Sequence, residues 1–224
     1  MRHERLIPIF TEEGMLRIKR ARVAVIGLGG VGGIATEALA RSGVGHLLLC
    51  DFDRIESSNI NRQVIASDET LGCLKVDVMR DQVNAINPEC EVIGIPEKYH
   101  EFLSEHHMEY VIDAIDDVAS KITLIRDCLR LKIPFISSMG AGNKTNPKLI
   151  TVVDIHKTSY DGLARTIRSA FRDVHFDVVA STEAPIHVES SERKPIIGSY
   201  MPVVASFGLM CSDYIIKQIL RRTL

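Results

Sequence analysis

The chain has 224 residues, of which 46% are hydrophobic and 25% charged, so its composition excludes a disordered protein and allows one sizeable domain. Its 27 Lys and Arg residues nearly balance its 29 Asp and Glu residues, so any contact with nucleic acid must come from a local basic patch. The five cysteines include no C-x-x-C pair, which excludes a cysteine-pair zinc site or a disulfide framework and fits a reducing cytoplasm.

Short apolar runs alternate with helical segments along the first two thirds of the chain. Residues 22–28 and 46–51 are predicted strands, and residues 29–42 and 74–87 are predicted helices, the second stopped by Pro88. Further apolar runs are EVIGI, YVIDAI, PFISSM and LITVVDI. Continuous apolar runs are typical of strands buried on both faces. We therefore predict a Rossmann-like α/β fold, an open, mostly parallel sheet with flanking helices and a small C-terminal extension.

The ends of the chain predict no membrane segment. The opening MRHERLIPIF lacks the apolar run of a signal peptide, and the late apolar stretch YMPVVASFGLM is too short to span a bilayer. A last helix is expected from about Val204, and the polar stretch HVESSERKPIIG before it is predicted to be a mobile surface loop. We expect a cytoplasmic protein without a membrane partner.

A glycine-rich turn joins the first predicted strand to the first predicted helix. It contains Gly27, Gly29, Gly30 and Gly32, which match a G-x-G-x-x-G pattern in the required strand–turn–helix context. Glycines let the main chain approach phosphate oxygens, and the helix N-terminus offers free N–H donors to an anion. The alternative is that these glycines serve only tight packing. Alone, the pattern indicates a nucleotide or dinucleotide site.

Asp51 ends the second predicted strand, where this architecture places the acid that binds a ribose. Taken alone, this position favours NAD, so an NAD-dependent oxidoreductase is one hypothesis. The donors and charges that follow are those that a triphosphate needs and a nicotinamide cofactor does not. They come from Asn59, Arg62, Gln63 and Lys75. Each of these residues, considered singly, is equally compatible with a solvated surface position.

Three aspartates lie at the carboxyl end of the predicted strand in YVIDAIDDV, at the same sheet edge as the glycine turn. They are Asp113, Asp116 and Asp117. A carboxylate here could hold Mg²⁺ on the phosphates, because this ion prefers one or two carboxylates together with phosphate oxygens. The alternative role is to cap the helix that begins at about residue 118. We assign the cap to Asp117 and the metal ligand to Asp116.

This set of residues, together with Asp53, resembles the adenylating superfamily of ubiquitin-activating enzymes and the ThiF/MoeB-type adenylyltransferases of molybdopterin and thiamine pathways. The matching spacing covers residues 2 to about 156. The resemblance implies ATP and magnesium as cofactors, with Asp51 and Asp53 on the nucleotide and Asp116 on the metal. The phosphate contacts that it implies are Asn59, Arg62, Gln63 and Lys75.

The opening RHERLI is similar to the superfamily's N-terminal arginine motif. This similarity implies that Arg5 contacts phosphate in the partner subunit's site, and hence that the protein is a homodimer. One departure follows the predicted strand YVIDAI, where the superfamily has Asp-Asn and this chain has Asp116 and Asp117. The role of the second position is therefore open.

The later sequence distinguishes branches of the superfamily. Branches that activate ubiquitin-like sulfur carriers commonly have a zinc C-x-x-C pair or a transferring cysteine, and STEAPIHVESSERKP contains no cysteine. Adenylation of a sulfur-carrier protein is therefore the disfavoured alternative. DIHKTSYDGLARTIRSAFR and VVASTEAP instead resemble the tRNA threonylcarbamoyladenosine dehydratase branch, apart from Gly162 where proline is expected. That resemblance implies ATP-dependent cyclisation of a modified tRNA, and it leaves open a sulfur-relay protein as a partner.

A modified tRNA requires a basic surface. In a predicted helix over residues 161–172, Arg165, Arg168 and Arg172 share one face, and the apolar face consists of Leu163, Ile167, Ala170 and Phe171. Lys157, Arg221 and Arg222 could extend the basic face, and the alternative is a solvated helix surface.

We expect one adenylating domain over residues 1–224, with residues 156–224 as a tRNA-binding and dimer-contacting extension. His156 and His175 lack a ligand partner at metal spacing, and Cys211 is expected in the core.

Overall fold

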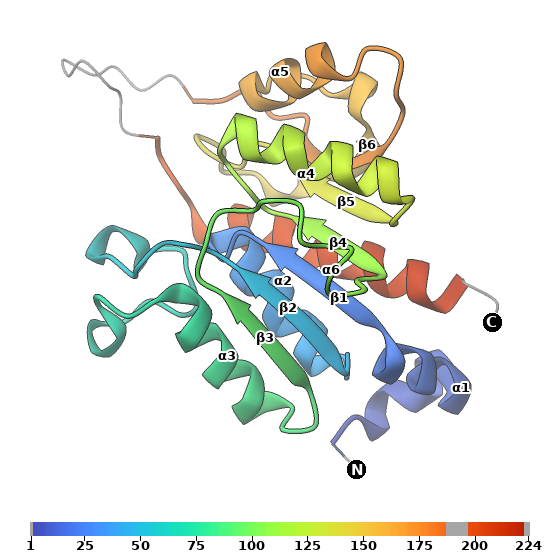
Figure 1. Ribbon diagram of the computed structural model, residues 1–224. Coiled ribbons are helices and arrows are strands. Elements are labelled where there is room, and N and C mark those ends of the chain that lie inside the picture. The colour runs from blue at the N-terminus through green and yellow to red at the C-terminus, as the bar shows by residue number, and fades with distance from the viewer. Residues whose placement is uncertain (1, 187–196, 222–224) are drawn as a thin grey trace.

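A central sheet carries helices on both of its faces (Figure 1). The computed structural model describes residues 2–186 and 197–221, and within them seven strands form one sheet in the order β3-β2-β1-β4-β5-β7-β6. All neighbouring strands are parallel except β6, which is antiparallel to β7. The predicted Rossmann-like, mostly parallel sheet is confirmed. The strands are β1 (Arg22–Ile26), β2 (His46–Cys50), β3 (Glu91–Ile95), β4 (Tyr110–Asp113), β5 (Phe135–Ser138), β6 (Ile150–Asp154) and β7 (Asp177–Ser181).

Two apolar cores lie on opposite faces of this sheet. In β1, Val23 and Val25 face a core shared with α1, α2, α3 and α6, whereas Ala24 and Ile26 face a core shared with α4 and α5. All four side chains are almost completely buried, which explains why the strand reads as a continuous apolar run. The helices are α1 (Ile7–Arg20), α2 (Gly30–Arg41), α3 (Lys75–Ile86), α4 (Val118–Leu131), α5 (Gly162–Ala170) and α6 (Met201–Arg221).

Helix α6 is longer than the sequence predicted. It has 21 residues and a mean hydropathy of 1.4 over its most apolar window, so by length and composition it could cross a membrane, and the expectation that this stretch is too short is wrong. Its apolar side is used in the core, where Phe207 and Cys211 are fully buried. Gly208 lets α6 approach α2, since a Cβ there would lie 2.4 Å from the Val31 carbonyl oxygen. Packing therefore accounts for the composition of α6, and Cys211 is confirmed as a core residue.

The structure differs from the prediction at three elements. Strand β7 and helix α1 have no counterpart among the predicted elements. Helix α5 ends at Ala170, which is exposed, so the buried side of the helix is formed by Ala164 and Ile167. Gly162, at the position where proline was expected, is the first residue after the N-cap Asp161, and proline is favoured at that position of a helix. The predicted loop around Ser190 and Arg222 lie outside the described residues.

Candidate active site

A cavity of about 1110 Å³ opens at the carboxyl ends of the parallel strands. Strands β2 and β4 lie on either side of β1, so the crevice lies where chain connections run in opposite directions, the usual ligand site of open α/β sheets. The volume exceeds the roughly 300–1,000 Å³ of most ligand pockets. The nucleotide half of the cavity is lined by residues 27, 29–30, 51–53, 57–59, 61–63, Lys75 and 114–117, and the acceptor half by residues 138–144, 160–163 and 197–199.

Two glycines of the turn are required by packing. Gly27 has φ +90°, in the left-handed region, and a Cβ there would lie 2.6 Å from the Ala114 carbonyl oxygen at the end of β4. A Cβ on Gly32 would lie 1.7 Å from the Gly27 carbonyl oxygen. Gly32 does not line the cavity. The packing alternative therefore accounts for these two positions.

The other two glycines differ from each other: a Cβ on Gly30 would lie 2.5 Å from Val204 Cγ1, so Gly30 is also required by packing, whereas Gly29 faces ligand space. Gly29 and Gly30 line the cavity at the N-terminus of α2, and Gly29 caps that helix without a side-chain hydrogen bond. A Cβ on Gly29 would meet only the amide nitrogen of Gln63, at 4.0 Å. The backbone N–H groups of this helix start are thus open to an anion, as the phosphate interpretation requires.

Asp51 joins the end of β2 to the glycine turn. Its Oδ2 accepts the N–H of Leu28 at 2.6 Å, and its Oδ1 accepts the N–H of Asp53 at 2.8 Å. Lys75, at the start of α3, lies with its Nζ 2.7 Å from Asp53 Oδ2 and 3.9 Å from Asp51 Oδ1. Burial raises the pKa of Asp51, and the Lys75 charge opposes this shift. The structure therefore brings the predicted ribose acid and the predicted phosphate lysine together.

The Asn-Arg-Gln cluster follows η2 (Ser57–Asn59) at the cavity wall. Asn59 has a structural role, because its Oδ1 accepts the Glu56 N–H at 3.2 Å in the cap of η2. Arg62 is partly exposed and donates from Nη1 to the Ser58 carbonyl oxygen at 2.7 Å. Gln63 is only 5% exposed, yet within the described chain its buried Oε1 has no hydrogen-bond partner. Such an unsatisfied polar group at a cavity is typical of a ligand site.

Asp113 is not available to a metal ion. Its side chain is fully buried and forms an ion pair with Lys121 at 2.7 Å, while the Ser137 hydroxyl donates to the same oxygen at 2.5 Å. A buried charge needs such partners, so this carboxylate stabilises the join between β4, α4 and β5.

The other two aspartates, Asp116 and Asp117, have different environments, and Asp117 is the helix cap that the sequence predicts. Asp117 caps α4, accepting the Ser120 N–H at 2.9 Å, and the hydroxyl and N–H of Ser120 lower the pKa of Asp117. Asp116 is exposed, lines the cavity, and forms no hydrogen bond or ion pair with any described residue. Its carboxylate is therefore free to bind a cation together with phosphate oxygens.

Arg5 lies apart from this cavity. It is an exposed residue of η1 (Glu4–Leu6), before α1, and is not among the residues that line the cavity of its own chain. Any contact of Arg5 with a nucleotide would therefore have to be made in another subunit.

The acceptor half contains residues that no sequence motif indicated. Lys144 is only 4% exposed in the loop after β5. Tyr160 is 64% exposed and has φ +52°, a left-handed conformation that is uncommon for an aromatic residue. Asp161 connects the two loops, accepting the N–H of Gly140 at 2.7 Å and that of Ala164 at 3.0 Å. The glycine-rich run GAGNK at the end of a predicted strand was the signal that could have located this loop.

The three arginines around α5 do not form one helical face. Arg165 is exposed, but Arg168 donates from Nη1 to the Thr158 carbonyl at 2.9 Å and to its hydroxyl at 2.7 Å. Arg172 is exposed and lies beyond the end of α5. The predicted basic face is therefore wrong in its geometry, and two arginines of the three remain free for a ligand.

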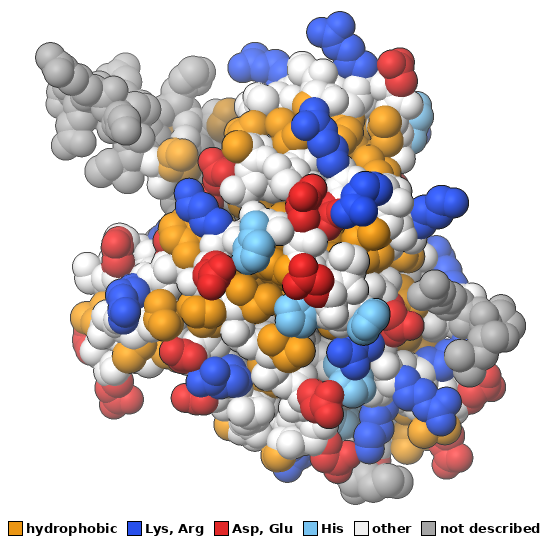
Figure 2. Space-filling view, in the orientation of Figure 1, with side chains coloured by type: hydrophobic (Ala, Val, Ile, Leu, Met, Phe, Trp, Pro, Cys, Tyr) orange, Lys and Arg blue, Asp and Glu red, His pale blue; other side chains and the backbone are white. Residues whose placement is uncertain are grey.

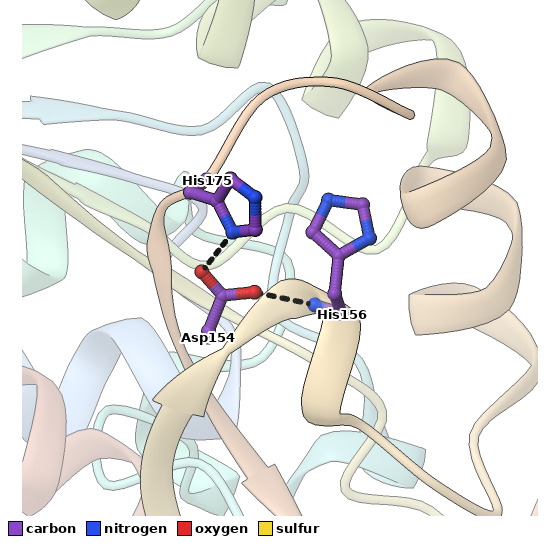
Figure 3. Close-up of side chains that lie close together, drawn as sticks. All are labelled: Asp154, His156 and His175. Atoms are coloured by element: carbon purple, nitrogen blue, oxygen red, sulfur yellow. Dashed lines mark hydrogen bonds and ion pairs between the residues drawn. The ribbon is translucent and has the colours of Figure 1, made fainter.

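The two histidines that looked isolated in the sequence lie together with Asp154 (Figure 3). His175 Nδ1 is 2.9 Å from Asp154 Oδ2, and the His156 backbone N–H donates to Asp154 Oδ1 at 2.8 Å. The His156 ring donates from Nε2 to the Val174 carbonyl at 3.1 Å. The backbone N–H of His156, followed by His175, lowers the pKa of Asp154. The expectation that the two histidines lack a ligand partner is thus wrong, although the His156 ring is hydrogen-bonded and His175 is exposed, and none of the three residues lines the cavity.

The fold and the cavity define a nucleotide-binding α/β protein whose anion-binding turn, acid and lysine meet at one sheet edge. The model of the ThiF family matches residues 2–223, so the chain belongs to the ThiF family. It is 39% identical to a tRNA threonylcarbamoyladenosine dehydratase of Bacillus subtilis (strain 168), over 94% of this chain and 91% of the relative. Its counterpart in Escherichia coli (strain K12) is 32% identical, over 96% of this chain and 91% of the relative.

Solved structures agree with this assignment. The crystal structure of the E. coli tRNA N6-threonylcarbamoyladenosine dehydratase in complex with ATP has a TM-score of 0.89 and 33% identity, covering 98% of this chain and 93% of that chain. By comparison, the molybdopterin-synthase adenylyltransferase of Salmonella typhimurium is 38% identical over only 57% of this chain and 53% of its own length.

Proposed function

We propose that this protein is an ATP-dependent tRNA threonylcarbamoyladenosine dehydratase. The observation that carries the proposal is the extent of similarity, because relatives with this name match 94% and 96% of the chain, including the C-terminal third. The molybdopterin-synthase adenylyltransferase of Salmonella typhimurium matches little more than half of it. Release of pyrophosphate from ATP that requires tRNA with the threonylcarbamoyl group tests the proposal. An equal release with unmodified tRNA would contradict it.

The dehydration requires that the threonylcarbamoyl carboxylate lose one oxygen atom, which ATP makes possible by converting that oxygen into part of a leaving group. The threonylcarbamoyl carboxylate attacks the α-phosphate of ATP, forming an acyl adenylate and displacing pyrophosphate. The ureido nitrogen then attacks the activated carbonyl, loses its proton and expels AMP, which closes a five-membered ring with net loss of water. The second step is intramolecular, so the enzyme contributes mainly positioning. No nucleophilic thiol is needed, and Cys211 is buried in the core.

The nucleotide half supplies the groups for the first step. The glycine turn and the start of α2 would bind phosphates, with Lys75 and Arg62 adding positive charge. Gln63 would satisfy its unpartnered Oε1 on the bound nucleotide or its water. Asp116 would hold Mg²⁺ against the phosphates, because it is the free carboxylate at this edge of the sheet among the described aspartates 113, 116 and 117.

A homodimer is part of the same proposal. Arg5 is exposed and outside its own cavity, so an N-terminal segment exchanged between subunits would bring it to the partner's phosphates. Helix α1, which follows Arg5, exposes two large apolar side chains, Ile9 at 68% and Leu16 at 54%. Exposed apolar side chains on one helix are expected where another subunit covers it. We place the enzyme in the cytoplasm, without a membrane partner.

The tRNA is proposed to bind across the end of the molecule formed by α5. Figure 2 shows Lys and Arg side chains at this end together with an acidic one, and charges of both signs over the rest of the face. Replacing Arg165 and Arg172 together with glutamine is expected to weaken tRNA binding and to flatten the log-log salt dependence by about one unit per lost phosphate contact. The measurement is tRNA affinity as a function of salt concentration.

A matched control removes two exposed cations elsewhere, Arg41 on α2 and Lys217 on α6. This control should leave the slope of the salt dependence unchanged. Nucleotide binding should be unchanged in both variants. If the Arg165 and Arg172 variant keeps the wild-type slope, the tRNA must bind at another surface.

A further inference from the structure

Lys144 is a buried cation in the acceptor half that the chemistry above does not use. It lies in the loop after β5, lines the cavity and is only 4% exposed. Its Nζ donates to the carbonyl oxygen of Glu183 at 2.9 Å and to that of Ser181 at 3.3 Å, both in the segment at the end of β7. The lysine therefore lies where the loop after β5 meets the segment that follows β7.

The charge of Lys144 lacks a contacting anion. An ammonium group has three donors, and the described residues provide two uncharged acceptors. Two carboxylates are near enough to act on its charge, those of Asp161 and Glu183, but neither forms an ion pair with it. Burial lowers the pKa of Lys144, against the effect of these two charges.

Both carboxylates are already occupied by backbone groups. Asp161 accepts the N–H groups that connect the loop after β5 to the start of α5. Glu183 accepts the N–H of Thr145 at 3.0 Å and that of Asn146 at 2.9 Å. A buried cation without a contacting anion is costly, so an anion that enters the cavity gains by completing the pair.

We propose that Lys144 binds the carboxylate of the threonylcarbamoyl group and so holds the nucleophile in the acceptor half of the cavity. This inference rests on the proposed function. The phosphates have their own cations, Lys75 and Arg62, in the nucleotide half of the same cavity. The carboxylate is the one charged group that the modification adds to the tRNA, and a charge-assisted hydrogen bond to a buried ammonium would recognise it.

The test compares two tRNAs that differ only at the carboxylate of the modification. One carries threonylcarbamoyladenosine, and the other carries the same group with a neutral carboxamide. The wild-type protein should bind the carboxylate RNA about 10- to 100-fold more tightly, the value of one charge-assisted hydrogen bond. Lys144→Met should remove this preference, while Lys144→Arg should keep part of it. Circular dichroism checks that each variant is folded, so that a lost preference can be assigned to the missing ammonium group.

Lys148→Met is the matched control, since Lys148 is an exposed lysine of the same loop region that does not line the cavity. It should keep the wild-type preference. Equal affinity of the wild-type protein for the two RNAs overturns the inference without any variant, and so does an unchanged preference in folded Lys144→Met. If the wild-type protein converts the modified tRNA but shows no such preference, this inference fails and the proposed function stands.

Discussion

Alanine in place of Asp116 is expected to lower turnover roughly a hundredfold or more, the scale of losing one preorganised charge contact at a reacting phosphate. The side chain is exposed and has no partner among the described residues, so its loss should leave the fold and melting temperature unchanged. The measurement is the rate of AMP formation with modified tRNA, titrated with Mg²⁺. A metal ligand predicts that the variant needs more Mg²⁺ to reach its reduced rate.

The neighbouring aspartate provides the control. Asp117→Asn removes one negative charge from the same strand end but keeps an oxygen that can accept the Ser120 N–H, because asparagine is an equally good N-cap. It also restores the Asp-Asn pair that is usual in the superfamily. We expect turnover close to that of the wild-type protein. A larger loss with Asp117→Asn than with Asp116→Ala would assign the metal to Asp117.

Arg5→Ala and Arg62→Ala should each reduce turnover by roughly a hundredfold or more as homodimers, and mixing the two proteins should restore part of the activity. If each site combines Arg62 of one subunit with Arg5 of the other, a mixed dimer contains one intact site and one doubly altered site. Random exchange makes about half of the dimers mixed, so about a quarter of the wild-type sites should return. The measurement is turnover before and after subunit exchange.

Arg20→Ala is the control for the N-terminal segment, because Arg20 is an exposed arginine at the end of α1 that does not line the cavity. By itself, the Arg20→Ala protein should show wild-type turnover. Mixed with Arg5→Ala, it should contribute only the intact sites expected from its proportion of the subunits. Absence of recovery in heterodimers verified by mass would show that the sites are not shared, and Arg5 would then lose its proposed role.

Local sequence patterns predicted the parallel part of the fold and the nucleotide half of the cavity. Strands β1 to β5 are apolar on both faces, and the turn glycines and Asp51 directly follow two of them, so their relative positions depend only on strand order. Asp117 could be assigned as a cap because capping is a contact within one turn of helix. These features need no information about distant segments.

The acceptor half of the cavity could not be predicted from local sequence patterns. Lys144 meets Ser181 and Glu183 because β7 inserts between β5 and β6, a pairing that no local period indicates. The same insertion brings His175 beside Asp154, which explains why the histidines looked unpartnered. Arg168 was misjudged for a different reason, since its partner Thr158 lies in the turn before α5 and helical periodicity does not predict a contact with that turn.

The most direct test of the proposed function is the mass of the modified nucleoside after tRNA carrying threonylcarbamoyladenosine has been incubated with the protein, ATP and Mg²⁺. The proposed function predicts a nucleoside lighter by one water molecule, formed only when ATP is present and matched by equal amounts of AMP and pyrophosphate. NAD in place of ATP should give no product. An unchanged nucleoside, from protein shown to bind both ATP and the modified tRNA, would contradict the assignment.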